Sequence, residues 1–297
     1  MRAFEYHLCD VFTSRPLEGN QLAVFPDAAS LTDSEMQAIA REMNLSETTF
    51  VHRRETEVEQ TRGIRVRIFT TQEELPFAGH PTLGTAATIR RIFSEYAGAE
   101  KIMLDLNAGQ IEVAFRANGE AEGSAAFGQM KQLDPVFGST HNPAAIAGVL
   151  GLRAEDIAGP APQTVSTGMA FCITVLRSVE ALGRLKLDTA RSVSYAAGSD
   201  AKFFYTLAPE DSGVWRARMQ FYNGEDPATG SAAGCAISYL VRHGLCASGE
   251  RLHLRQGIEI GRPSDLYLSA VFRNGEVSEV RVGGSTVPVA KGHIFLE

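Results

Sequence analysis

The stretch that decides the fold is FAGHPTLGTAATI at residues 77–89, because a close copy, GEDPATGSAAGCAI, recurs at residues 224–237. Both contain Pro-x-x-Gly-[Ser/Thr]-Ala-Ala. A proline near the motif's start predicts that a helix begins there. The second copy continues with apolar or very small residues on all sides, which is typical of a buried helix. We therefore expect each helix to lie inside a curved sheet.

The repeat extends into the flanking sequence. RVRIF (65–69) precedes the first helix and RARMQF (216–221) precedes the second, while LNAGQIE (106–112) and LRQGIE (254–259) follow them. Chance similarity between two Ala/Gly-rich helices is the alternative, but it does not explain a shared order of elements. The sequence therefore indicates a duplication.

The duplication predicts two domains, residues 1–132 and 133–287, with the last strand, 288–297, a candidate to return to the first. The polar segment RANGEAEG (116–123) and the segment LDPVFGSTHNP (133–143) mark the region where the first half ends. The halves should pack directly against each other, since no long linker separates them.

Alternating apolar residues predict strands in both halves, and few segments predict surface helices. The predicted strands are 4–12, 21–25, 64–70, 101–106, 110–115, 171–176, 203–207, 215–221, 251–256, 258–261 and 265–272. One surface helix is predicted at 31–44, where Thr32 and Glu35 have the spacing of a capping box. The fold class is α+β.

Composition excludes several classes of protein. With 44% hydrophobic and 21% charged residues, the chain resembles an ordinary soluble protein, and its net charge of −7 argues against nucleic-acid or membrane partners. No apolar run reaches the roughly 18 residues of a membrane span. The N-terminus lacks a signal-peptide core. The four cysteines show no paired spacing, so we expect buried or incidental thiols and a cytoplasmic location.

The duplicated loops suggest a binding site. Backbone N–H groups at the start of a helix bind anions, and the absence of a lysine after either glycine favours a small carboxylate over a nucleotide phosphate. Two such helix ends facing each other across a domain interface would form a cleft. The alternative is that both loops only cap core helices.

A titratable residue precedes the proline in each copy, His80 in the first and Asp226 in the second. A residue before proline is held extended, which would project these side chains away from the helix. The histidines and cysteines show no zinc-binding spacing, and Ser231 is not in a Gly-x-Ser-x-Gly elbow. With a zinc site and a serine nucleophile set aside, the sequence favours general acid–base chemistry without a metal. We expect His80 to titrate near its ordinary pKa and Asp226 to stay ionised.

Glu47, at the start of a predicted strand, completes the candidate set, although alone it could be a solvated charge. Together, five motifs resemble the PhzF family of phenazine-biosynthesis isomerases, within the wider diaminopimelate-epimerase-like fold: GNQLAVF (19–25), AREMNLSETTFV (40–51), ELPFAGHPTLGTA (74–86), DPATGSAAG (226–234) and RQGIEIGRPS (255–264).

The resemblance implies two β-barrel-like domains, each wrapped around a central helix, with the active site between them. It implies that Glu47 moves the proton and that His80, Asp226 and Ser231 assist it. The candidate substrate-binding residues are Asn20, Ser46, Gly79, Thr229 and Gly230. It also implies a homodimer that requires no cofactor. Thiol-based epimerisation, used by relatives with a cysteine pair, is disfavoured because none of the cysteines lies in these loops.

The family's named reaction isomerises trans-2,3-dihydro-3-hydroxyanthranilate: a proton leaves C3 and returns at C1, and the enol then tautomerises to a ketone. The sequence leaves the substrate open. One alternative is an epimerase or racemase of a small amino or hydroxy acid, with Glu47 and Asp226 as opposed bases. The other is a non-catalytic protein that binds small acids.

Overall fold

The computed structural model describes residues 1–116, 125–221 and 224–297, so most of the predicted boundary segment 116–123 lies outside the described residues. The chain forms two compact units. The first comprises Met1–Lys131 and Gly283–Glu297, and the second comprises Gln132–Val282. The domain borders expected from the sequence were 132/133 and 287/288.

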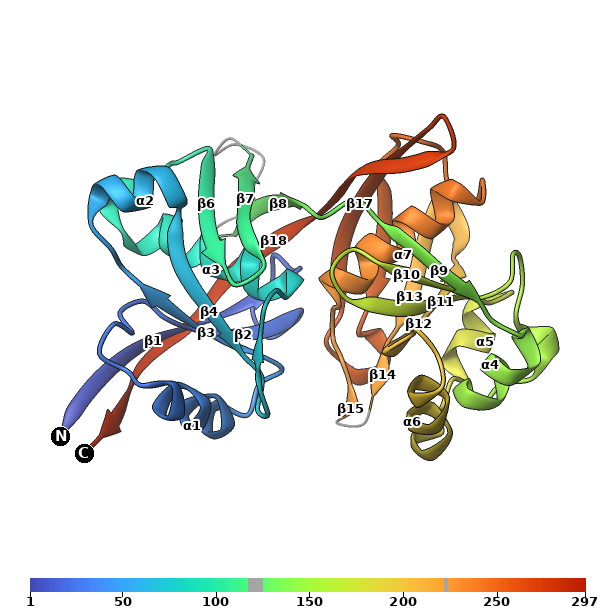
Figure 1. Cartoon of the computed structure of the whole chain (residues 1–297), viewed down its shortest axis with the longest axis horizontal. Coiled ribbons are helices and arrows are strands. Elements are labelled where there is room, and N and C mark those ends of the chain that lie inside the picture. Colours follow the sequence, from blue (N-terminus) through green and yellow to red (C-terminus); the bar gives the residue numbers. More distant parts are fainter. Residues whose placement is uncertain (117–124, 222–223) are drawn as a thin grey trace. The chain divides into compact units, whose positions relative to one another are not determined.

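The first unit is a closed sheet of eight strands around one helix (Figure 1). The strands follow the order β1-β2-β3-β4-β6-β7-β8-β18, and β18 pairs again with β1, from Arg2 opposite Leu296 to Val11 opposite Thr286. The elements are β1 (Arg2–Val11), β2 (Asn20–Phe25), α1 (Asp33–Met43), β3 (Thr48–His52), α2 (Thr56–Arg62), β4 (Ile64–Phe69), β5 (Glu74–Leu75), α3 (Gly79–Ile92), β6 (Lys101–Leu106), β7 (Gly109–Phe115), β8 (Ala126–Lys131) and β18 (Glu276–Leu296).

Helix α3 is the core of this unit. Every residue from Gly79 to Ile89 is buried. A Cβ added at Gly84 would lie 2.6 Å from Leu22 and 2.8 Å from Val11, so the sheet approaches the helix backbone too closely for a larger residue. The small residues of the motif are therefore required by the distance between helix and sheet.

In the second unit, eight strands lie around α7 in the order β9-β10-β11-β12-β13-β16-β17-β18. Its elements are β9 (Val136–Thr140), α4 (Pro143–Leu150), β10 (Gln163–Ser166), β11 (Ala170–Val175), α5 (Val179–Gly183), α6 (Thr189–Ala197), β12 (Phe203–Pro209), β13 (Val214–Arg218), β14 (Gln220–Phe221), β15 (Gly224–Glu225), α7 (Gly230–Arg242), β16 (Leu252–Gln256) and β17 (Ser264–Arg273).

The two units share one pattern of strand pairing, which confirms the duplication. In the first, β2 and β3 are parallel, β3 and β4 antiparallel, and β4 and β6 parallel. In the second, the corresponding pairs β11–β12, β12–β13 and β13–β16 have the same directions. In each unit the buried helix connects the last two parallel strands, so both motif copies occupy equivalent places. The α+β, epimerase-like fold is confirmed.

Local predictions succeeded where the signal was strong. Helix α1 has the predicted capping box between Thr32 and Glu35, and it ends at Asn44 in the left-handed conformation. The strand expected at 258–261 was wrong. This segment is a 3-10 turn, because Gly257 and Gly261 on either side adopt positive φ angles of 76° and 70°.

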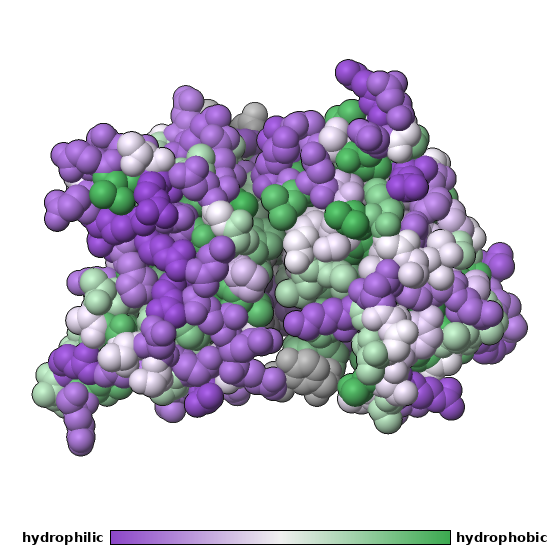
Figure 2. Space-filling view, in the orientation of Figure 1, coloured by the Kyte–Doolittle hydropathy of each residue, from purple (hydrophilic) through white to green (hydrophobic). Residues whose placement is uncertain are grey.

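The surface is mixed in character. On the face that Figure 2 shows, hydrophobic residues are interspersed with hydrophilic ones, and the exposed large hydrophobic side chains are scattered along the chain. Among the described residues, no helix is long and apolar enough to cross a membrane.

Candidate active site

Three residues from separate elements of the first unit meet at the start of α3. The His80 ring lies between Asn20, the first residue of β2, and Glu47, which directly precedes β3. Its Nδ1 is 3.3 Å from the Asn20 amide nitrogen, and its Nε2 is 3.6 Å from Glu47 Oε2. A neutral ring that accepts at Nδ1 carries its proton on Nε2, facing Glu47, whereas a ring that donates from Nδ1 presents the lone pair of Nε2 to Glu47.

Burial controls the charge of His80. The residue is 4% exposed, and burial lowers its pKa to about 3, opposed only in part by a hydrogen bond with the Gln21 backbone. The expectation that His80 titrates near its ordinary pKa is therefore wrong. The sequence could not show this, because desolvation depends on the barrel that surrounds the ring. A neutral His80 ring has one nitrogen that donates a hydrogen bond and one that accepts.

The position of His80 in α3 is a second correction. The sequence predicted an extended residue projecting from the helix, but α3 begins at Gly79, so His80 and Pro81 lie in its first turn. In the second unit, Asp226 and Pro227 precede α7, which begins at Gly230. The two motif copies therefore differ locally. Packing of α3 against the sheet overrides the preference of a residue before proline for extended backbone.

The candidates in the second unit gather at the start of α7. Thr229 is the N-terminal cap of α7. Its hydroxyl donates a 2.6 Å hydrogen bond to Asp226 Oδ2 rather than to the helix. Gly230 is buried, and its carbonyl accepts a hydrogen bond from Gln132. Ser231, the second residue of α7, is half-buried. Neither α3 nor α7 has a side chain capping its first turn within the described ranges.

The site candidates thus form two groups, one in each unit. Asn20, Glu47, Gly79 and His80 belong to the first group, and the half-buried Ser46 precedes Glu47 in sequence. Asp226, Thr229, Gly230 and Ser231 form the second group. That both groups engage one substrate stays a prediction.

Sequence reasoning missed Gln256, a completely buried residue at the end of β16. Its amide hydrogen-bonds Asp226, Thr229 and Tyr205. The signal was available, because β16 alternates inward and outward and places Gln256 on the same face as Leu252 and Leu254. A polar residue at an inward position of a strand indicates a hydrogen-bonding role.

The cysteines agree with the prediction of buried thiols. Cys9, Cys172 and Cys235 are buried, and burial raises their pKa values to about 12, about 12 and about 11. These thiols are protonated at neutral pH. Within the described ranges, no group of three or more Asp, Glu, His or Cys side chains could hold a metal ion.

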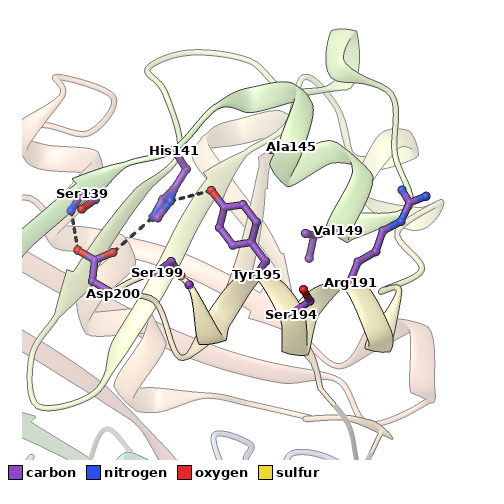
Figure 3. Close-up of a pocket in the computed structure, with 10 residues that line it drawn as sticks. Ser139, His141, Ala145, Val149, Arg191, Ser194, Tyr195, Ser199 and Asp200 are labelled. Atoms are coloured by element: carbon purple, nitrogen blue, oxygen red, sulfur yellow. Dashed lines mark hydrogen bonds and ion pairs between the residues drawn. The ribbon is translucent and has the colours of Figure 1, made fainter.

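A separate pocket of about 590 Å³ lies between α4 and α6 (Figure 3). Both ring nitrogens of His141 are engaged, Nδ1 with Tyr195 at 3.0 Å and Nε2 with Thr164 at 2.8 Å. Thr164 in turn donates to Asp200, which also accepts the backbone N–H of Ser139. These hydrogen bonds connect α6 to the sheet, and both nitrogens of the His141 ring are already engaged by protein groups.

Comparison with known proteins shows the family of the chain. The sequence profile of the phenazine biosynthesis-like protein family, PhzC-PhzF, matches residues 9–292. A trans-2,3-dihydro-3-hydroxyanthranilate isomerase from Pseudomonas aeruginosa is 35% identical over 295 residues, which cover 98% of this chain and 99% of that protein.

Solved structures share the fold of this chain. A predicted epimerase from Pseudomonas aeruginosa has a TM-score of 0.83 at 34% identity, covering 99% of this chain and 100% of that one. A PhzF-family protein from Bacillus anthracis has a TM-score of 0.87 at 24% identity, with both chains fully covered. The chain therefore belongs to the PhzC-PhzF family of phenazine biosynthesis-like proteins and is an isomerase.

Proposed function

We propose that this isomerase moves a proton between carbons of a small carboxylic acid without a cofactor, with trans-2,3-dihydro-3-hydroxyanthranilate or a related acid as substrate. The observation that carries the proposal is the contact of Glu47 with the neutral, buried His80. A carboxylate that is 16% exposed is available to a substrate yet partly desolvated. Partial desolvation moves a carboxylate toward the basicity that proton abstraction from carbon needs.

In the proposed mechanism Glu47 removes the proton from C3 as its carboxylate and returns it to C1 as its carboxylic acid, so the base is regenerated. His80 Nε2 is buried and has no hydrogen-bond partner among the described residues, and Glu47 Oε2 lies 3.6 Å from it. We propose the tautomer in which Nε2 carries the proton, so that its N–H can donate to the carboxylate or to a substrate oxygen. Such a donor stabilises negative charge as it develops.

The uncapped starts of α3 and α7 support the binding of an acid. The first N–H groups of a helix have no partner within the helix, and they favour a carboxylate there. We propose that the substrate carboxylate contacts N–H groups around Gly79–His80 or Gly230–Ser231. Asp226, held as an acceptor by Thr229, would balance the charge of a substrate amine.

Hydrogen exchange in deuterated buffer tests the proposal. The isomerase should convert trans-2,3-dihydro-3-hydroxyanthranilate and place the transferred hydrogen at C1, with deuterium at C1 wherever the proton exchanges with solvent. Binding of this acid without conversion or label would instead indicate a non-catalytic binding protein. Label at a chiral carbon with inverted configuration, in a small amino or hydroxy acid, would indicate the epimerase alternative.

A further inference from the structure

The amide of Gln256 uses its full hydrogen-bonding capacity on one loop and one strand. Its Nε2 donates to the Asp226 carbonyl at 2.8 Å and to Thr229 Oγ1 at 3.0 Å. Its Oε1 accepts from the Thr229 backbone N–H at 3.1 Å and from the Tyr205 hydroxyl at 2.8 Å. Gln256 has no exposed surface, so water does not compete for these bonds.

Two of these partners fix the orientation of the amide. A backbone N–H can only donate and a backbone carbonyl can only accept, so Oε1 faces Thr229 N and Nε2 faces the Asp226 carbonyl. Thr229 Oγ1 then receives a proton from Nε2. The hydroxyl must direct its own proton elsewhere, and Asp226 Oδ2 lies 2.6 Å away. The orientation of the Gln256 amide therefore decides which atom donates in each of these hydrogen bonds.

We propose that Gln256 is a positioning residue that aims the Thr229 hydroxyl at the Asp226 carboxylate and fixes the loop at the start of α7. This inference rests on the proposed function only where it concerns turnover. Without the amide, the hydroxyl can rotate toward Met219 Sδ, which lies 3.2 Å from it. The Asp226 carboxylate would then lose a donor.

The consequence can be measured on Asp226 itself. A hydrogen bond to a carboxylate favours its charged form, so loss of the hydroxyl bond should raise the pH at which Asp226 titrates. Tyr205, on β12, is a titratable side chain whose hydroxyl also hydrogen-bonds the Gln256 amide. Its pKa is raised well above the ordinary value, first by burial and second by the charge of Asp226. Tyr205 therefore stays neutral over the range of the experiment.

The experiment compares Gln256→Met, Thr229→Val and the double variant with the unmodified chain. Three quantities are measured: the ¹³C NMR titration of the Asp226 carboxylate, assigned with Asp226→Asn; kcat and KM well below the melting temperature; and the free energy of unfolding. Gln163→Met is the matched control. Gln163 is also buried, and its amide bonds Gly138 and His243, away from the start of α7.

We expect Thr229→Val to raise the Asp226 titration midpoint by about one pH unit and to lower kcat/KM about tenfold, the size of a lost bond to a charged group. Gln256→Met should shift both quantities in the same direction. The Asp226 midpoint of the double variant should match that of Thr229→Val, because both changes act on that carboxylate through the same hydroxyl bond. Gln163→Met should lower stability only.

The inference is overturned if Gln256→Met lowers stability as Gln163→Met does while the Asp226 midpoint stays unchanged. It is also overturned if the shifts of the Asp226 midpoint in the two single variants add in the double variant. The titration needs no substrate. Should the unmodified chain fail to turn over, the proposed function would be wrong, while the midpoints would still decide the role of Gln256.

Discussion

Replacing Glu47 with glutamine is the most direct test of the proposed mechanism. Glutamine keeps the size of the side chain and removes its basicity. Because a positioned base contributes about 10² to 10⁴ in rate, kcat should fall by at least about 10², which corresponds to about 2.7 kcal/mol of barrier.

The assay is the initial rate of conversion, with substrate affinity measured separately by calorimetry. Glu42→Gln is the matched control, since Glu42 is an exposed residue of α1 and its substitution should leave the rate unchanged. Near-normal turnover of Glu47→Gln would remove Glu47 from the mechanism. A loss of binding equal to the loss of turnover would make Glu47 a substrate-binding residue instead of the base.

Three further predictions concern His80, Asp226 and the packing of α7. His80 stays neutral when folded but binds a proton below pH 6.5 when unfolded, so its contribution to stability is present above pH 6.5 and is lost as pH falls toward 3. Between pH 6.5 and 5, the free energy of unfolding in urea should fall by about 2 kcal/mol less for His80→Gln than for the unmodified chain. Equal falls for the two proteins would contradict the neutral ring. Asp226→Asn should raise KM for an amine-bearing substrate about tenfold or more and keep the shape of the pH–rate profile, and an unchanged KM would argue against charge balance. Gly234→Ala should lower the stability measured by thermal unfolding by about 1–3 kcal/mol, because the new Cβ overlaps the buried Gln132 amide. As the control, Gly183→Ala places its Cβ where no atoms lie within 4 Å, and its stability should be unchanged or higher.

The site shows where prediction from sequence stops. Motifs indicated Glu47, His80 and Asn20, but only the closed barrel places residues from β2, the start of β3 and α3 around one ring. Their roles in catalysis, the cytoplasmic location and the homodimer stay predictions. The neutral state of His80 and the bonds of Gln256 depend on burial, which no local pattern encodes.

The sequence by itself determined the elements whose causes are local. The capping box at Thr32, the small residues of α3 and α7 and the strand alternation act over a few residues, so they can be read directly. The tertiary structure decided what depends on distant partners. Pairing of β18 with β1 joins the two ends of the chain, and the helical backbone of His80 arises from packing against the sheet. Such contacts form only when the whole sheet closes, because each one joins residues far apart in the chain.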